Sequence, residues 1–274
     1  MPATLGILNC NNGARLGANG VAVVFARELA LLELLSGTAG PQGISLGVSR
    51  AATLADMSKA QASRTFASLE AEGLVIRDPQ TREYRLGWRL GALLIDTKPQ
   101  RTLEKVQDRI QRLLPMTEGF GASFAVLRGE EVLIVYGTSP SGVHRKLGWE
   151  RKSFPSHRTA GGRVLLATLD AHELEAAFDG PMPESVGALT TSLARTRELG
   201  YAISDGEFHP EQCGVAALVW GEDGRVVGAL ALQGAQLEGS PAEREAELHR
   251  LGAEVARAAE ELSHDLGWER APVG

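Results

Sequence analysis

Near residue 120 the spacing of apolar residues first changes from that of helices to that of a sheet, and this change constrains the fold more than any other feature. Up to about residue 114, apart from one short hairpin, they recur every three to four residues, as on one face of a helix. From residue 121 they form short runs between turn residues, as in strands. A length of 274 residues is enough for two domains, so we predict an α+β protein whose helical domain comes first.

The start of the chain is predicted to form three helices, over residues 22–36, 48–56 and 59–72. The first has one apolar stripe, made of Phe25, Leu29, Leu32 and Leu35. A break over 37–43 follows it, rich in Gly, Pro and Thr. Ser58 is well placed to cap the third helix, and Gly73 to end it in the left-handed conformation.

Two short strands are predicted directly after the third helix, over residues 74–76 and 83–86. The sequence Asp-Pro-Gln-Thr between them has the composition of a turn. Three helices followed by a hairpin make a winged helix-turn-helix. Arg77, Arg82 and Arg85 fall on or near the hairpin, where contact with DNA is common. Acidic neighbours leave ordinary surface charge as the alternative.

The third helix carries most of the predicted contacts with DNA. Ala62, Phe66 and Leu69 form its buried face, so the short polar side chains between them project outward. Gln and Arg can pair with purine edges, and Ser and Lys can contact phosphates. A solvated helix face is the alternative. The predicted DNA-binding residues are Ser58, Lys59, Gln61, Ser63, Arg64, Ser68 and Arg82.

The remainder of the chain mixes helices with strands. A helix over 88–97, ended near Pro99, would link the domains, and it would either transmit a change in shape or simply pack against a helix over 101–114. Four strands are predicted, over 123–127, 132–136, 214–220 and 225–233. Four more helices are predicted, over 163–169, 171–178, 191–199 and 241–265. This pattern favours an antiparallel sheet with helices on its faces.

Composition excludes several classes of protein. The two cysteines form no Cys-x-x-Cys pair, which argues against a disulfide framework and a cysteine-based zinc site, and fits a reducing compartment. No apolar run approaches the ~18 residues of a membrane span, and the first twenty residues lack a signal-peptide pattern. We therefore expect a cytoplasmic protein without membrane contact. A net charge of −6 means that any DNA contact comes from a local surface.

An enzyme is the alternative class of protein. Its catalytic pair would be Cys213 as nucleophile and His209 as base. Pro210 interrupts a regular helix between them, and no third residue that would orient the base is evident. The histidines show no His-x-x-x-His spacing. We expect no catalytic residues, no metal and no cofactor. A protein-binding module that does not contact DNA is a further alternative.

Seven segments together point to one family. In the first domain they are 58–64 (SKAQASR), 69–75 (LEAEGLV) and 84–87 (YRLG). In the second they are 156–167 (SHRTAGGRVLLA), 197–202 (RELGYA), 205–207 (DGE) and 224–230 (GRVVGAL). In this order, and over about residues 22 to 265, the chain resembles the IclR family of bacterial transcription regulators. A winged helix alone is shared by many families, whereas the segments of the first domain followed by those of the second are specific to this family.

The resemblance implies a GAF-like effector-binding domain, dimers that often pair into tetramers, and control of operator DNA by a small carboxylate or aromatic effector, most often by repression. The expected domains are a flexible tail over 1–20, the winged helix over 21–87, a linker helix over 88–99 and the effector domain over 100–267. The effector-binding residues it implies are Thr159, Ala160, Gly161, Ser204, Asp205, Gly214, Ala231 and Gln233.

Elementary chemistry supports part of that list. A helix that starts with Gly161-Gly162 leaves backbone N–H groups free for an anion and lets a ligand approach closely, although tight packing alone would also explain the two glycines. Asp205 can contact a ligand or cap a turn. Arg158 and Arg163 are additional candidate partners for an anion, or they face solvent.

Two positions depart from the family pattern. Gly214 and Ala231 lack the polar side chains that relatives can carry there, and relatives can also carry a serine in place of Gln233. We therefore expect a pocket that is more apolar or larger than in relatives that bind small keto acids. An aromatic or bulkier ligand is the corresponding expectation.

Overall fold

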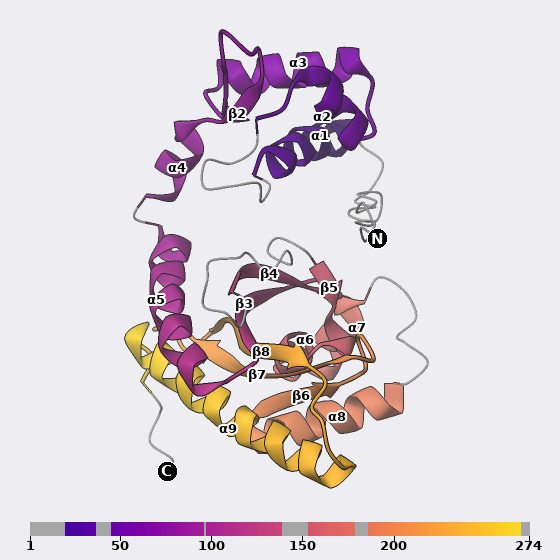
Figure 1. Cartoon of the computed structure of the whole chain (residues 1–274), viewed down its shortest axis with the longest axis vertical. Coiled ribbons are helices and arrows are strands. Elements are labelled where there is room, and N and C mark those ends of the chain that lie inside the picture. The colour runs from indigo at the N-terminus through magenta and orange to yellow at the C-terminus, as the bar shows by residue number, and fades with distance from the viewer. Residues whose placement is uncertain (1–19, 37–44, 96, 139–152, 179–185, 270–274) are drawn as a thin grey trace. The chain divides into compact units, whose positions relative to one another are not determined.

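The structure is a computed structural model that describes residues 20–36, 45–95, 97–138, 153–178 and 186–269 (Figure 1). Contacts within the chain divide it into two compact units, residues 1–97 and residues 98–274. The predicted tail over 1–20, apart from Gly20, and the predicted break over 37–43 lie outside the described residues.

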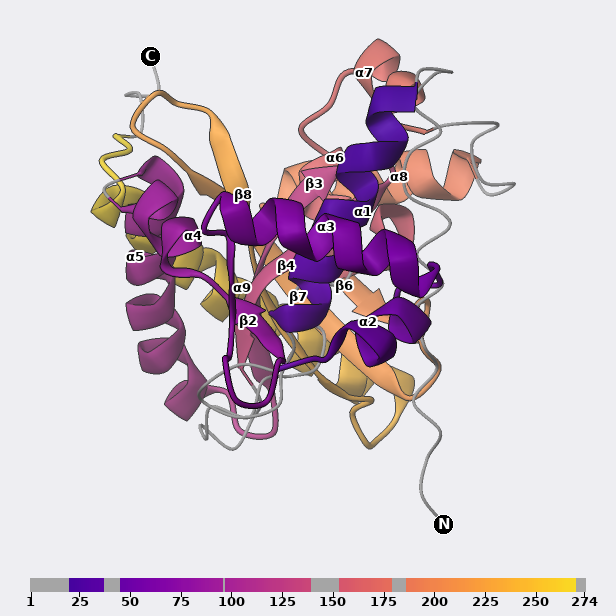
Figure 2. The ribbon, with the colours of Figure 1, turned by 90° about the horizontal axis from the view of Figure 1, so that it is seen from above.

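The first unit is a winged helix-turn-helix, as predicted. Its elements are α1 (Gly20–Leu35), α2 (Val48–Leu54), α3 (Lys59–Ala71), β1 (Val75–Arg77), β2 (Tyr84–Leu86) and α4 (Trp88–Leu94). The helix α3 crosses over α1, and the β1–β2 hairpin lies beside them (Figure 2). One hydrophobic core contains buried residues from α1, α2, α3 and both strands of the hairpin. Within it, the ring of Phe66 from α3 stacks on Tyr84 from β2 with centroids 4.2 Å apart.

The predicted apolar stripe of α1 is wrong in its first half. Phe25 is 72% exposed and Leu29 is 40% exposed, whereas Leu31 and Leu35 are fully buried against α3 and the hairpin. The sequence of α1 is apolar on nearly every side, so spacing alone could not select the face that packs. Among the described side chains of α1, the fully buried ones, Leu31 and Leu35, lie in its second half.

The second unit is built on a six-stranded antiparallel sheet, with strand order β5-β4-β3-β8-β7-β6. The strands are β3 (Gly121–Arg128), β4 (Glu131–Thr138), β5 (Ser153–Pro155), β6 (Tyr201–Asp205), β7 (Gln212–Trp220) and β8 (Val226–Ala235). The helices are α5 (Lys98–Leu113), α6 (Ala160–Leu166), α7 (Ala171–Ala177), α8 (Val186–Leu199) and α9 (Pro241–Asp265). The α+β architecture is therefore confirmed.

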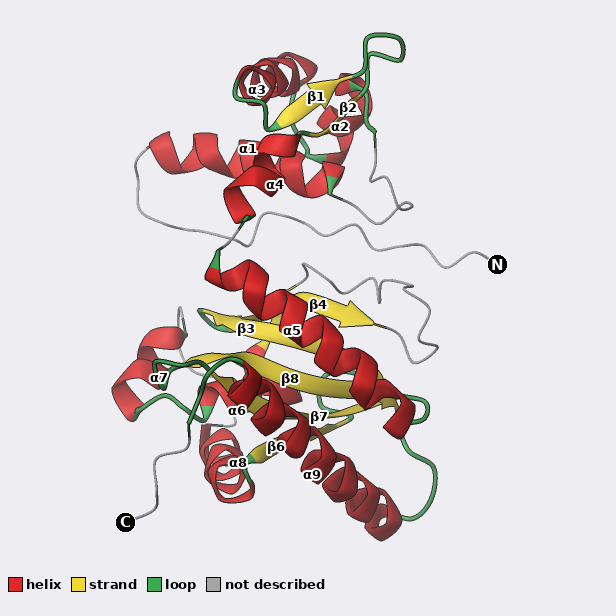
Figure 3. Cartoon of the chain, turned by 90° about the vertical axis from the view of Figure 1, so that its left-hand side faces the viewer, coloured by secondary structure: helices red, strands yellow, loops and turns green. Residues whose placement is uncertain are grey.

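Helices cover both faces of this sheet (Figure 3). On one face, α5 and α9 pack together over β3, β7 and β8, with Val106 and Val255 fully buried in the shared core. On the other face, α6 buries Val164 and Leu165 against the alanines of β7 and β8, and α8 packs beside it. This second face has smaller side chains, so it is where space for a ligand is left.

Several predicted elements of the second unit need correction. The strands β5 and β6 were not predicted, because β5 is short and the Ser204-Asp205 end of β6 has the composition of a turn. Both segments are extended because β5 pairs with β4 and β6 pairs with β7. The helix α6 starts at Ala160, three residues before the predicted start. Pro99 does not end a helix but lies in the first turn of α5, where its missing N–H costs no hydrogen bond.

Candidate functional site

The N-terminus of α3 is fixed by a capping box. The Ser58 hydroxyl accepts a hydrogen bond from the Gln61 backbone N–H at 3.2 Å, and the Gln61 side-chain oxygen accepts one from the Ser58 N–H at 3.0 Å. Ser58 is thus the predicted cap. Paired recognition of a base edge by Gln61 would require both ends of its amide, so the capping box competes with that predicted role.

The outer face of α3 has the character expected of a surface that enters a groove. Lys59, Ser63, Arg64 and Ser68 are exposed, and the intervening alanines at 60 and 67 are exposed as well. The opposite face is buried, with Ala62 and Phe66 fully inaccessible. Short side chains around one arginine leave the helix backbone close to anything that contacts this face.

The hairpin of the first unit presents two of its three arginines to solvent. Arg82 has a left-handed backbone (φ 59°) and is exposed, as is Arg85. Arg77 instead lies over the ring of Tyr84, 5.5 Å from its centroid. The turn is held by the Asp78 carboxylate, which accepts the N–H groups of Gln80 and Thr81, both at 2.8 Å, and these bonds lower the pKa of Asp78.

A second candidate site lies between the sheet and the start of α6, and we call it the inner pocket. It has a volume of about 90 Å³. Six of the eight predicted effector-binding residues line it: Thr159, Ala160, Gly161, Gly214, Ala231 and Gln233. The other lining residues are Ser123, Ala125, Val132, Ile134, Phe154, Phe208, Gln212, Cys213 and Leu232. Sequence reasoning did not find these nine, because strands far apart in sequence bring them together.

The inner pocket is apolar, and none of the described residues that line it carries a charge. Its deepest polar contact is a hydrogen bond of 3.0 Å that the Ser123 hydroxyl donates to the Gln233 side-chain oxygen. The Gln233 amide nitrogen is buried and, among the described residues, has no hydrogen-bond partner. A buried donor without a partner is rare in folded proteins, so this atom marks a place where a ligand oxygen would be stabilised.

The two glycines at the start of α6 have different roles. A side chain at Gly162 would place its Cβ 2.1 Å from the backbone oxygen of Ser156, so tight packing requires this glycine. A Cβ at Gly161 would meet nothing within 4 Å, and Gly161 lines the inner pocket. Thr159 caps the helix by accepting the Gly162 N–H at 3.1 Å. Gly161 therefore leaves space in the inner pocket, and Gly162 allows the start of α6 to pack closely against Ser156.

Gly214 gives the inner pocket no extra room. A Cβ at Gly214 would lie 2.8 Å from the backbone oxygen of Leu232 and 3.6 Å from the Cβ of Gln233, so the absent side chain leaves no extra room. The glutamine across the strand pair already fills that space, since Gly214 and Gln233 are register partners. The pocket agrees with the sequence in being apolar, but it is narrow.

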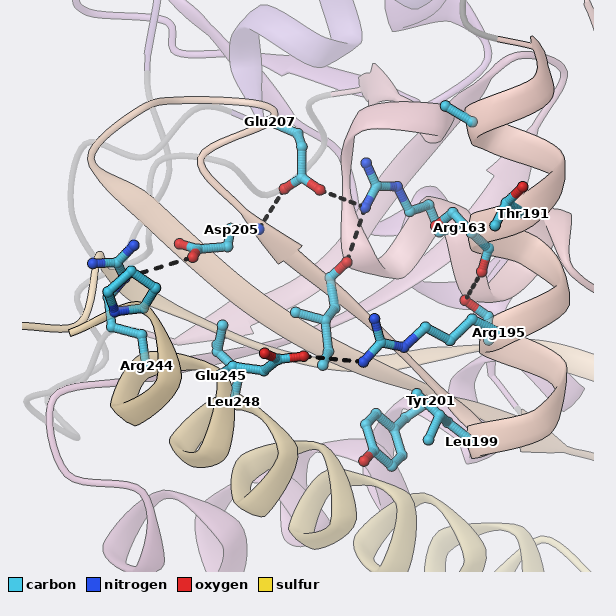
Figure 4. A pocket seen from close by; sticks show the side chains of 15 residues that line it. Arg163, Thr191, Arg195, Leu199, Tyr201, Asp205, Glu207, Arg244, Glu245 and Leu248 are labelled. Atoms are coloured by element: carbon cyan, nitrogen blue, oxygen red, sulfur yellow. Dashed lines mark hydrogen bonds and ion pairs between the residues drawn. The ribbon is translucent and has the colours of Figure 1, made fainter. Parts of the chain in front are cut away.

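Ser204 and Asp205, the other two predicted effector-binding residues, lie outside the inner pocket. The Ser204 hydroxyl bonds to the backbone oxygen of Arg158 and to Glu207. Asp205 accepts a hydrogen bond from Gln236 at 3.2 Å and lies 3.8 Å from Arg244. Asp205 belongs instead to a groove of about 660 Å³ between α8, β6 and the start of α9, which we call the outer groove (Figure 4).

The outer groove is lined by ion pairs that are already formed. Arg163 donates to Glu207 at 2.7 Å (Figure 4) and to the backbone oxygen of Ile203 at 2.9 Å. Arg158 donates to the Glu207 backbone oxygen at 2.7 Å. Burial alone would raise the pKa of Glu207, but the hydrogen bond and charge of Arg163 lower it overall. Both arginines named as anion partners from the sequence are thus engaged with this loop.

The pair suggested for catalysis does not form. The Cys213 thiol donates to the backbone oxygen of Ala235 at 3.2 Å, and burial raises its pKa, which disfavours the thiolate. The His209 ring nitrogen Nδ1 accepts the Glu211 N–H at 3.4 Å. Within the described ranges, no three His, Cys, Asp or Glu residues could together hold a metal ion, and no helix is long and apolar enough to span a membrane.

Two family models match the chain. The model described as "Bacterial transcriptional regulator IclR C-terminal" matches residues 99–264, and the "IclR helix-turn-helix domain" matches residues 25–79.

Individual relatives agree with these models. The chain is 30% identical to the glycerol operon regulatory protein of Streptomyces griseus over 255 residues, which covers 88% of this chain and 95% of that protein. It is 29% identical to the HTH-type transcriptional regulator XynR of Escherichia coli K12 over 219 residues, covering 75% and 83%. An IclR homolog of Microbacterium hydrocarbonoxydans complexed with 4-hydroxybenzoate has the same fold (TM-score 0.66, 22% identity, covering 89% and 98%).

Proposed function

The chain belongs to the IclR family of bacterial transcriptional regulators, and from that membership we propose how this regulator binds DNA and which pocket controls it. The exposed face of α3 enters the major groove of operator DNA, and the hairpin arginines contact the backbone beside it. A small organic effector binds in the inner pocket and changes operator affinity. The protein acts in the cytoplasm, where it represses transcription.

One observation carries the DNA-binding part of the proposal. The face of α3 opposite the core combines Arg64 with short side chains, so the guanidinium can reach a guanine edge while the helix lies deep in the groove. Lys59 and Arg82 are exposed on the same unit and are placed to neutralise phosphates. The net charge of the whole chain is negative, so this contact depends on the local surface.

Exposed apolar side chains support assembly into a homodimer. On α1 they are Phe25 and Leu29, and at the first residue of α4 and just after its end the chain exposes Trp88 (84% exposed) and Ile95. Leucines at 93 and 94 are exposed in the same segment. Large apolar surfaces of this kind are typical of protein interfaces, and a dimer would present two α3 helices to a palindromic operator. Pairing of dimers into tetramers is a further step of the same proposal.

The inner pocket supports the effector part of the proposal. It joins the start of α6 to five strands, and it contains a buried donor that has no partner among the described residues. A ligand that fills it would link α6 to the sheet, and this favours one arrangement of the domain over another only if the ligand binds the two arrangements with different affinity. The ligand of the Microbacterium homolog, 4-hydroxybenzoate, belongs in any first panel of candidate effectors.

The DNA-binding proposal is tested with duplex DNA selected by the purified protein from a random library. Binding is followed by fluorescence anisotropy at several salt concentrations for the wild type, Arg64→Ala and the control Arg112→Ala, an exposed arginine of α5. Loss of Arg64 is expected to weaken binding by about 1–3 kcal/mol and to relax the sequence preference. The control is expected to match the wild type.

Two outcomes would overturn that assignment. If Arg64→Ala bound the selected DNA as well as the wild type, α3 would not be the recognition helix. If no sequence were enriched and binding did not depend on salt, the chain would be better described as a protein-binding module.

A further inference from the structure

The inner pocket combines a narrow apolar cavity with a buried, neutral hydrogen-bond donor that has no partner among the described residues, the Gln233 amide nitrogen. We propose that its ligand is a small neutral carbonyl compound, such as an amide, lactone or ketone, whose oxygen accepts a hydrogen bond from the Gln233 amide nitrogen. The proposal rests on the inner pocket being the effector site. It separates this chain from regulators whose effectors are carboxylates.

The size of the cavity limits the ligand. A cavity of 150 Å³ holds benzene, which has six non-hydrogen atoms, in an engineered protein, so a cavity of about 90 Å³ encloses about four such atoms. The pocket is partly open to solvent, so the end of a compound of about six non-hydrogen atoms can extend out of it. Gly214 adds no space, because Gln233 and the backbone of β8 already lie against it. The body of the ligand would contact Val132 and Ile134 of β4, whose side chains offer only dispersion contacts.

The aromatic wall of the pocket has a defined shape. The rings of Phe154 and Phe208 meet edge to face with centroids 5.2 Å apart, and both line the cavity. Phe208 follows Glu207, which is held by Arg163 on the outer side of the same loop. The wall is therefore anchored from outside, and a compact ligand fits without displacing it.

Gln233 supplies the specificity. Its side-chain oxygen is held by the Ser123 hydroxyl at 3.0 Å, which leaves the amide nitrogen as the donor without a partner. The bond to Ser123 also fixes the side chain before any ligand arrives, so little conformational entropy is lost on binding. A carbonyl oxygen satisfies the buried donor, whereas a hydrocarbon of the same shape leaves it without a partner.

A carboxylate would be poorly matched to this environment. Among the described residues, no lysine or arginine lines the cavity, and the nearby Arg158 and Arg163 already bond to Glu207 and to backbone oxygens. A buried carboxylate needs a cation or several donors to offset the loss of hydration. Beyond Gln233, the described lining offers it the backbone N–H groups at the start of α6, a helix of seven residues, and the Gln212 amide, but no cation. A neutral carbonyl group needs one donor, which Gln233 provides.

Three probes of six non-hydrogen atoms test the ligand class. Butyramide and butyrate have the same shape and differ in charge, and cyclopentanone can accept a hydrogen bond but cannot donate one. Affinities for the full-length protein are measured by ligand-observed NMR titration near neutral pH. We expect butyramide and cyclopentanone to bind, and butyrate to bind at least about tenfold more weakly. Equal or tighter binding of butyrate would overturn the proposal, and so would failure of cyclopentanone to bind.

Variants test the role of Gln233. Gln233→Leu removes the donor and is expected to weaken both neutral probes by about fivefold. Gln233→Glu keeps an oxygen for Ser123 but removes the N–H, so it is expected to weaken them at least as much. Gln236→Leu, the same change three residues later and outside the pocket, is the matched control and should bind like the wild type. Unchanged probe affinity in both Gln233 variants, with normal thermal unfolding, would contradict the assignment.

Operator binding measured in parallel separates this inference from the proposed function. If the probes show the expected preference but do not change operator affinity, the ligand class stands and control of DNA binding through this pocket fails. If operator binding is intact while butyrate binds as tightly as butyramide, the ligand class fails and the DNA-binding function stands.

Discussion

The inner pocket and the outer groove lie on two sides of the same short stretch of chain, and they differ in every property that matters for binding. The inner pocket is small, carries no charge and contains a buried donor without a partner. The outer groove is several times larger and contains three arginines and three carboxylates (Figure 4). Its arginines already have partners, among them Glu207, Glu245 and Asp205.

The difference shows that volume is a poor guide to a ligand site. In the outer groove a ligand would have to displace ion pairs such as Arg163–Glu207, and those pairs would be regained only in part. In the inner pocket a ligand oxygen would complete the hydrogen bonding of Gln233. The outer network then has a structural role, since it holds the loop that carries Phe208.

The largest expected effect contrasts the two glycines of α6. Gly162→Ala forces a Cβ into the backbone of Ser156, and we expect a loss of about 3 kcal/mol or more in the free energy of unfolding. Gly161→Ala meets no clash and is expected to be neutral or stabilising by less than about 1 kcal/mol. Urea unfolding of both variants measures the contrast. Equal destabilisation would mean that Gly161 is also a packing residue and not an opening for ligand.

A comparable contrast is expected between two alanines, now in ligand binding. Ala231→Leu fills the inner pocket and should abolish detectable binding of butyramide, because a cavity of about 90 Å³ has no room for both groups. Ala188→Leu places the same side chain in the outer groove and should leave binding unchanged. Ligand-observed NMR titration measures both, with thermal unfolding as the check on folding. Loss of binding in Ala188→Leu alone would reverse the assignment of the two sites.

Asp205 provides a test with a smaller effect. Because its carboxylate bonds to Gln236 and Arg244 and does not line the inner pocket, Asp205→Ala should change butyramide affinity by less than about twofold. The free energy of unfolding should fall by about 0–1 kcal/mol, as for other solvent-screened ion pairs. A strong loss of ligand affinity would indicate that Asp205 reaches the ligand, as the family resemblance implied.

The smallest effect concerns pH and Glu207. Its pKa in the folded protein is lowered by Arg163, so the Arg163–Glu207 pair adds stability above the ordinary pKa of 4.5, and this contribution is lost as the pH falls through the folded value. The carboxylate is partly exposed, so the contribution is about 0.5 kcal/mol. Unfolding at pH 7 and pH 3.5 should show a smaller pH difference for Glu207→Gln than for the wild type. Identical pH differences would mean that the pair adds nothing.

The sequence predicted the winged helix well because its determinants are local. The Ser58 cap, the left-handed Gly73 and the buried spacing of Ala62, Phe66 and Leu69 are all contained within one helix. The buried face predicted for the first half of α1 was wrong, because the sequence of a helix that is apolar on nearly every side does not show which side packs. Gln61 was predicted to contact DNA, and its part in the capping box was missed, although it lies three residues after Ser58 as a capping box requires.

The ligand site was best predicted where its residues follow one another in a single sequence motif. Thr159, Ala160 and Gly161 came from one motif, and the structure places them together in the inner pocket. Ser123 and Phe208 could not be found in the same way, because their position depends on strand register and on a loop between β6 and β7. Ser204 and Asp205 lie at the end of the edge strand β6, where Ser204 bonds to Arg158 and Glu207 and Asp205 lines the outer groove.

Methyl-labelled NMR during a butyramide titration tests most directly whether the inner pocket is the binding site. Ala231 and Ile134 line the inner pocket, and Ala188 and Leu248 line the outer groove. The account predicts that the methyl signals of Ala231 and Ile134 shift with a common affinity, while those of Ala188 and Leu248 stay in place. Shifts confined to Ala188 and Leu248 would contradict the account and assign ligand binding to the outer groove.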